Sequence, residues 1–101
     1  MKFYYPYKSD KPDKKFYIIT STNKKVYFGA SGYNDYIIYN EKLGKEGADK
    51  KRELYIKRHS KMNEDWGKSG INTAGWWSRW FLWEKRTLKE AYKFIENKIL
   101  I

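Results

Sequence analysis

The sequence predicts an α+β fold, in which an N-terminal β-hairpin or small antiparallel sheet packs against two or three helices. Three observations predict it. Residues 16–28 alternate as β-strands do, residues 88–99 repeat apolar side chains at helical spacing, and residues 73–83 hold four of the five tryptophans. A chain of 101 residues is expected to form one domain, here over residues 16–101 behind an extended arm of residues 1–15.

The arm holds both prolines and a cluster of charges, which disfavour a regular element. It has two interpretations. Its tyrosines, Tyr4, Tyr5 and Tyr7, fold back onto the domain, or the arm reaches a neighbouring molecule or a nucleic-acid groove. A hairpin follows at about residues 15–28, because β-branched and aromatic residues alternate on both sides of a turn at residues 23–24.

The middle of the chain carries weaker patterns. Gly29 and Gly32 mark a bend, with a phosphate-cradling nest as the alternative. Residues 35–39 have the composition of a short strand or of a short helical turn, and we expect the strand or an extended segment. Residues 40–47 are expected to form a polar loop. Asp49 is then expected to begin a helix that runs to about residue 61. Its apolar face is narrow and most of its surface is charged, which is typical of a solvated helix or of a helix that binds anions.

Residues 73–83 are expected to form an aromatic helix that Thr73 caps. The four tryptophans of this helix are candidates for core or interface positions: Trp76, Trp77, Trp80 and Trp83. Exposure of Trp76 or Trp77 would indicate a base-stacking surface or an anchor in a protein interface. Residues 87–90 have the form of a capping box, and the clearest amphipathic helix of the chain follows at about residues 88–99.

Lysine and arginine number 22 against 12 acidic residues, so the net charge is +10. This excess indicates a partner that carries phosphates, anionic lipid or acidic side chains. The expected phosphate-binding residues lie on the predicted middle helix and in the aromatic helix, where the single charge is expected to face water or an anionic partner: Lys50, Lys51, Arg52, Lys57, Arg58, Lys61 and Arg79.

Catalytic chemistry is poorly represented. The chain has one histidine and no cysteine, and its carboxylates are scattered, so we predict no enzymatic activity, no metal site and no cofactor. A nuclease would require Asp35, Glu64, Asp65 or Glu90 to converge near His59. The apolar runs are too short to span a membrane, and the N-terminus lacks the apolar core of a signal peptide, so we expect an intracellular protein that is not secreted.

Four parts of the sequence together resemble a known family: KVYFGASGYNDY at residues 25–36, YIKRH at residues 55–59, Trp66, and SGINTAGWWSRWFLW at residues 69–83. The chain is similar over roughly residues 15–97 to small basic proteins of unknown function from large nucleocytoplasmic DNA viruses, such as mimivirus-like, phycodnavirus-like and iridovirus-like agents. The resemblance brings no binding residues. It implies a viral origin and a place in the virion, the host-cell cytoplasm or the virus factory. The Tyr-rich arm and residues 84–86, where a proline is expected, depart from the family pattern.

The charge therefore predicts a non-enzymatic basic protein that binds nucleic acid phosphates, DNA above all, without strong sequence preference, and the resemblance implies a viral protein that acts in genome packaging or the virion. The alternative is a minor capsid or virion-scaffold protein that contacts acidic viral proteins.

Overall fold

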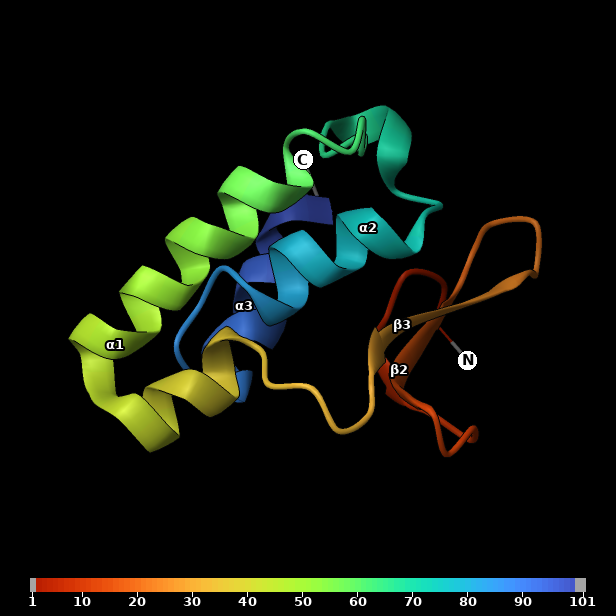
Figure 1. Cartoon of the computed structure of the whole chain (residues 1–101). Coiled ribbons are helices and arrows are strands. Elements are labelled where there is room, and N and C mark those ends of the chain that lie inside the picture. The colour runs from red at the N-terminus through yellow and green to blue at the C-terminus, as the bar shows by residue number, and fades with distance from the viewer. Residues whose placement is uncertain (1, 100–101) are drawn as a thin grey trace.

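The computed structural model describes residues 2–99 and confirms the α+β class, with an N-terminal three-stranded antiparallel sheet followed by helices (Figure 1). The strands are β1 (Tyr7–Lys8), β2 (Lys14–Ile19) and β3 (Lys25–Ala30). The main helices are α1 (Tyr36–His59), α2 (Ala74–Trp77) and α3 (Leu88–Ile99). A 3₁₀ turn, η1 (Lys68–Gly70), precedes α2, and a π-helical segment, η2 (Ser78–Leu82), continues it.

The predicted hairpin is present, and its register pairs Phe16 with Phe28. These two rings, with Ile18, lie on the face of the sheet that packs against the helices. The N-terminal arm folds back onto the domain, which is the first of its two interpretations, but the expectation that it holds no regular element is wrong, because it contains β1 and the first residues of β2. β1 pairs with β2, and Tyr92 of α3 donates its hydroxyl hydrogen to the Pro6 carbonyl at 2.6 Å.

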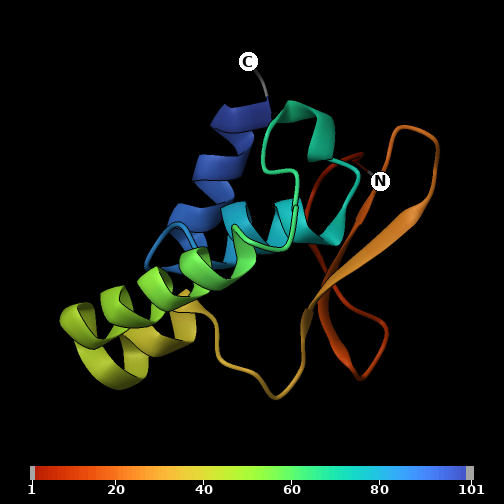
Figure 2. The same ribbon diagram turned by 45° about the horizontal axis from the view of Figure 1, so that its top comes forward.

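The aromatic segment forms the centre of the core, between the sheet and α3 (Figure 2). Trp77 and Phe81 are fully buried, and Phe81 meets both Phe16 and Phe28 edge to face. The predicted cap is present, because the Trp76 amide donates to Thr73 Oγ1 at 3.3 Å. The expected single helix is instead one α-helical turn that widens into η2.

α3 occupies the predicted residues and packs Ala91 and Ile95 into the core. The amide of Glu90 donates to Thr87 Oγ1 at 3.2 Å, and the Thr87 hydroxyl donates to the Glu90 carboxylate at 3.0 Å. The first bond satisfies one amide of the first turn, which is half of the predicted capping box, whereas the Glu90 carboxylate accepts from the Thr87 hydroxyl and not from a backbone amide.

The middle of the chain differs from the prediction. Residues 35–39 are not a strand, residues 40–47 are not a loop, and Asp49 does not begin a helix. One helix, α1, covers these residues with a kink at Gly44, where φ is +77°. Asp35 is its N-cap, with Oδ1 accepting from the Ile38 amide at 3.0 Å. The prediction was wrong because the β-branched Ile37 and Ile38 resemble a strand, whereas the cap and the buried Tyr36 favour a helix.

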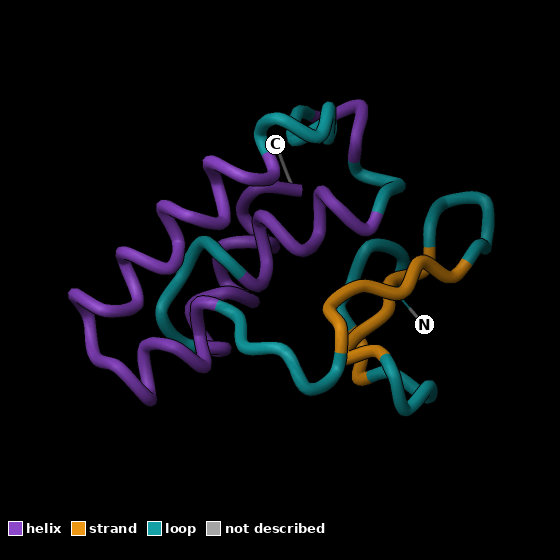
Figure 3. The backbone as a smooth tube through the Cα atoms, in the orientation of Figure 1, coloured by secondary structure: helices purple, strands orange, loops and turns teal. Residues whose placement is uncertain are grey.

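Asp49 instead links the two halves of α1 to each other and links the helix to the connection before α3. It accepts from the Tyr36 hydroxyl at 2.5 Å and pairs with Arg86 at 3.0 Å, and Arg86 also donates to Asn40 at 2.8 Å. The kinked α1 therefore lies beside the core, and the loop of residues 31–35 joins it to the sheet (Figure 3). Among the helices of residues 2–99, none combines the length and apolar character that crossing a membrane requires.

Candidate anion-binding cleft

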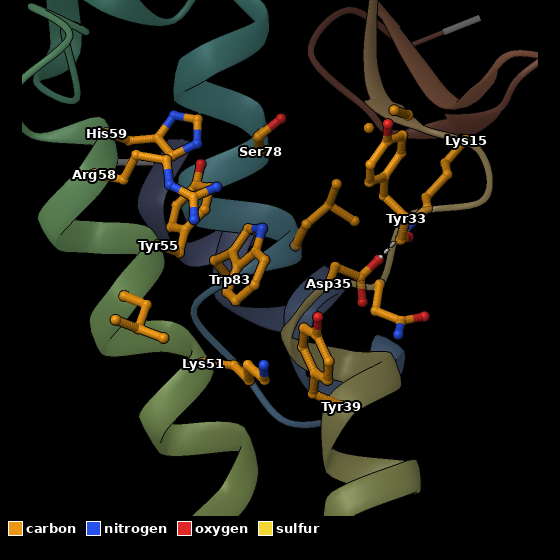
Figure 4. A pocket seen from close by; sticks show the side chains of 15 residues that line it. Lys15, Tyr33, Asp35, Tyr39, Lys51, Tyr55, Arg58, His59, Ser78 and Trp83 are labelled. Carbon is orange, nitrogen blue, oxygen red and sulfur yellow. Dashed lines mark hydrogen bonds and ion pairs between the residues drawn. The ribbon is translucent and has the colours of Figure 1, made fainter.

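A cleft of about 410 Å³ lies between the second half of α1 and the loop that leads from β3 into α1. Its floor comes from η2 and from Trp83, which follows η2 (Figure 4). The kink of α1 and its attachment through Asp49 place the helix opposite this loop. Two segments distant in sequence thereby form the walls of one site.

The helix wall presents one face of α1. Lys51, Leu54, Tyr55 and Arg58 follow one another at i, i+3, i+4 and i+7, which places their side chains along a single stripe. Lys51 and Arg58 are exposed, and neither has an acidic partner within salt-bridge distance among residues 2–99. The wall thus presents two cations without an acidic partner, one on each side of Tyr55.

The rear of the cleft is a stack of three rings. Tyr55 lies between His59, at 4.2 Å between ring centroids, and Trp83, at 4.3 Å with planes only 5° apart. Tyr55 is buried, and burial raises the pKa of its hydroxyl well above the usual range, so this group is neutral. The stack holds Trp83 rigidly at the cleft floor, with Tyr39 tilted towards it at 6.1 Å.

The loop wall is fixed by Lys15. Its ammonium group pairs with Asp35 at 2.9 Å and donates to the Tyr33 carbonyl at 2.5 Å. The charge of Lys15 is therefore largely compensated, while the Tyr33 backbone is held in place. Tyr33 is 74% exposed as a residue, and its ring makes no ring contact with another aromatic residue of the described chain. It stands on the opposite side of the cleft from Tyr55 and Arg58 (Figure 4).

Gly29 brings the sheet close to the cleft floor. Its φ of +76° is a conformation that side chains rarely adopt, and a Cβ atom there would lie 2.8 Å from Cδ1 of Leu82. The bend predicted at Gly29 is therefore required both by the backbone and by packing against η2.

Of the four carboxylates that a nuclease would require near His59, that of Glu64 lies beside it. His59 Nδ1 lies 2.8 Å from the Glu64 carboxylate, which also accepts from the Trp66 indole at 2.9 Å. The other candidate carboxylates are engaged elsewhere, since Asp65 accepts from the Gly67 amide at 3.0 Å and Glu90 contacts Thr87. Within residues 2–99, no three His, Asp or Glu side chains gather as a metal-binding group.

The seven predicted phosphate-binding residues divide into two groups. Those with exposed side chains are Lys50, Lys51, Lys57, Arg58 and Lys61. The other two are engaged within the chain. Arg52 donates to the Glu84 carbonyl at 2.9 Å and lies over the Tyr36 ring at 4.5 Å.

Arg79 does not face water as expected. Its side chain is 11% exposed and pairs with Glu84 at 3.0 Å, while its guanidinium lies 4.3 Å from the centroid of the Trp80 ring. Arg79 belongs to the widened turn of η2, and its side chain lies over the rings of Trp80 and Trp66 instead of pointing outward.

The predicted aromatic residues also divide. Trp76 and Trp77 are buried, whereas Trp80 and Trp83 are half-buried. Sequence reasoning did not find Tyr33 as a cleft residue. Its position after Gly32 in a polar loop gave one indication, since an aromatic ring in such a loop has no predicted core to join.

Comparison of the chain with protein families, with curated proteins and with solved structures returned no match.

Proposed function

We propose that the protein binds the phosphate backbone of nucleic acid through the cationic face of α1, without enzymatic chemistry and without strong sequence preference. The observation that carries this proposal is the set of exposed cations on the second half of α1: Lys50, Lys51, Lys57 and Arg58. Their side chains take no acidic partner within residues 2–99. A helix face that keeps its charge uncompensated suits an anionic ligand.

The spacing of these cations supports a polymer as the ligand. Lys50 and Lys57, and likewise Lys51 and Arg58, are seven residues apart, which is about 10.5 Å along a helix. Two adjoining stripes of charge can therefore meet several phosphates at once. Such contacts position a strand but read no sequence, because every nucleotide carries the same phosphate. The net charge of +10 adds long-range attraction to the same ligand.

On the resemblance to small basic proteins of large DNA viruses, we propose that this activity serves genome packaging or the virion, with DNA as the partner. A minor capsid or scaffold role is the second candidate, and the exposed Phe3, Leu43 and Met62 support protein contacts. An exposed patch around Trp76 and Trp77 would have supported that role more strongly, but both side chains are buried. We therefore rank phosphate binding first.

The test is fluorescence anisotropy with labelled DNA between about 50 and 200 mM salt. Each phosphate contact adds about 0.9 to the slope of log affinity against log salt, so four contacts give a slope of about 3.6. A variant with Lys50, Lys51, Lys57 and Arg58 changed to Ala should lose most of that slope.

The matched control removes the same charge elsewhere, by changing the exposed Lys24, Lys68, Lys89 and Lys93 to Ala. This control should bind more tightly than the α1 variant. Equal weakening by both variants would show that only net charge matters, and the assignment to α1 would be wrong.

A further inference from the structure

We infer that the cleft takes one unpaired nucleotide, so that the preferred ligand of the protein is single-stranded nucleic acid. The base would lie between Trp83 and Tyr33, with the flanking phosphates at Lys51 and Arg58. This inference rests on the proposed phosphate binding and names the form of nucleic acid that the same face selects.

The first support is the ring stack at the rear of the cleft. The His59 ring stacks on Tyr55, and Tyr55 stacks on Trp83, with the centroids of Tyr55 and Trp83 4.3 Å apart. Trp83 is the last ring of this parallel stack. It is half-buried and lines the cleft floor, and the Tyr39 ring lies beside it at 6.1 Å with its plane tilted by 50° (Figure 4). A nucleobase that enters the cleft would extend this stack by one ring, because every base has a π face.

The second support is Tyr33. The residue is 74% exposed, yet its backbone is held, because Lys15 donates to its carbonyl and Asp35, two residues later, caps α1. An aromatic side chain on a fixed loop, opposite a rigid ring stack, gives a base a second surface. Ordering it costs little because a tyrosine has only two side-chain torsions to fix.

The third support is the position of the two cations. Lys51 lies one turn before Tyr55 on α1, and Arg58 lies about one turn after it. A strand that crosses the cleft with one base inserted would bring the phosphates before and after that base to these side chains. Both cations line the cleft, whereas Lys50 and Lys57 lie on the neighbouring stripe outside it.

Duplex DNA meets only part of this arrangement. Its phosphates can contact the outer cations of α1, but its bases are paired and stacked, and unstacking one costs a few kcal/mol. The cleft volume of about 410 Å³ is within the usual range of small-ligand sites. The cleft therefore discriminates for an unpaired base, while the helix face binds phosphate of either form.

The experiment compares a labelled oligothymidine, a duplex of equal phosphate number, and thymidine monophosphate, all at one salt concentration. We expect the oligothymidine to bind at least tenfold more tightly than the duplex and far more tightly than the monophosphate. The Tyr33→Ala variant should weaken single-strand binding about 5-fold to 140-fold, which corresponds to one lost stack, and leave duplex binding unchanged. Tyr33→Phe keeps the ring and should bind as the unchanged protein does.

Phe3→Ala is the matched control, because Phe3 is exposed, aromatic and outside the cleft. A strand that carries 5-iodouracil supplies a second readout, and its photo-crosslinks should map to Tyr33 or Trp83. Equal binding of duplex and single strand, an unaffected Tyr33→Ala variant, or crosslinks away from the cleft would overturn the inference and leave the phosphate binding standing. Monophosphate binding as tight as that of the strand would also overturn it. If the unchanged protein shows no salt-sensitive binding to either polymer, the proposed phosphate binding is wrong as well.

Discussion

Two regions of this molecule are held in place by different forces. In the first, the sheet and α3 enclose α2 and η2, and Trp77, Phe81 and Phe28 pack there with almost no exposure. In the second, α1 is 24 residues long but buries only Tyr36, Ala48 and Tyr55. The first region depends on apolar burial, and the second on a small number of specific contacts.

Two ion pairs hold α1 in place. Asp35 pairs with Lys15 at one end of the helix, and Asp49 pairs with Arg86 at its middle. The stack of Tyr55 on Trp83 is its main aromatic contact with the core. Apolar burial is non-directional and shared by many neighbours, whereas each polar tie depends on one pair of groups. We therefore expect the core to unfold as a unit and α1 to open locally at lower free energy.

The largest expected effect is that of Trp77→Ala. Removing a fully buried tryptophan leaves a cavity among Phe28, Trp76 and the other core rings, and should lower the free energy of unfolding by about 3 to 5 kcal/mol. Urea denaturation followed by circular dichroism measures it. The exposed Phe3→Ala should cost less than about 0.5 kcal/mol. A loss confined to α1, with the sheet intact, would contradict the division into two regions.

A smaller effect is expected at the contact between the sheet and η2. Gly29→Ala forces a Cβ to within 2.8 Å of the Leu82 side chain at a φ of +76°, and should cost about 2 to 3 kcal/mol.

Gly32→Ala is the control for this variant. Gly32 has a similar φ of +87°, but no atom lies within 4 Å of the place that a Cβ would take, so only backbone strain of about 1 to 2 kcal/mol remains. The difference between the two free energies of unfolding isolates the packing contribution. Equal losses would show that Leu82 moves aside freely and that this part of the core is loosely packed.

The same division explains which elements the sequence predicts. The hairpin and α3 belong to the apolar region, where one face of each element must be buried, so alternation and the spacing of Ala91 and Ile95 are visible in the sequence. The kinked α1 has no such continuous stripe, and Gly44 together with Ile37 and Ile38 resembles a loop beside a strand. Polar ties such as that between Asp49 and Arg86 join residues 37 positions apart and leave no periodic pattern.

The candidate site is predictable to a similar extent. Lys51 and Arg58 are recognisable because they are cations on a charged helix, which is a local property of the sequence. Tyr33 becomes meaningful only when the fold places its loop opposite α1. Arg79 was mispredicted because its direction depends on the π-helical turn, which the helical spacing of the tryptophans does not reveal.

The smallest expected effect is the response of α1 to acid. The hydrogen bond from Arg86, and next that from Tyr36, hold the pKa of the Asp49 carboxyl below its usual range. As the pH falls, the unfolded chain therefore takes up this proton at a higher pH than the folded chain does. The free energy of unfolding decreases as a result. The contribution of Asp49 is present above its unfolded pKa, about 3.9, and is lost as the pH falls through the lowered folded value.

Amide hydrogen exchange, expressed as protection factors to remove the intrinsic pH dependence, should therefore show α1 opening below about pH 4 while α3 stays protected. Asp49→Asn should weaken protection in α1 at neutral pH and reduce its acid dependence. Asp10 provides the control, since the hydrogen bond from Tyr27 lowers the pKa of its carboxyl in the hairpin region. Asp10→Asn should leave the acid response of α1 unchanged. If α1 and α3 lose protection together in acid, the polar ties of α1 are coupled to the apolar core, and the two regions form a single unfolding unit.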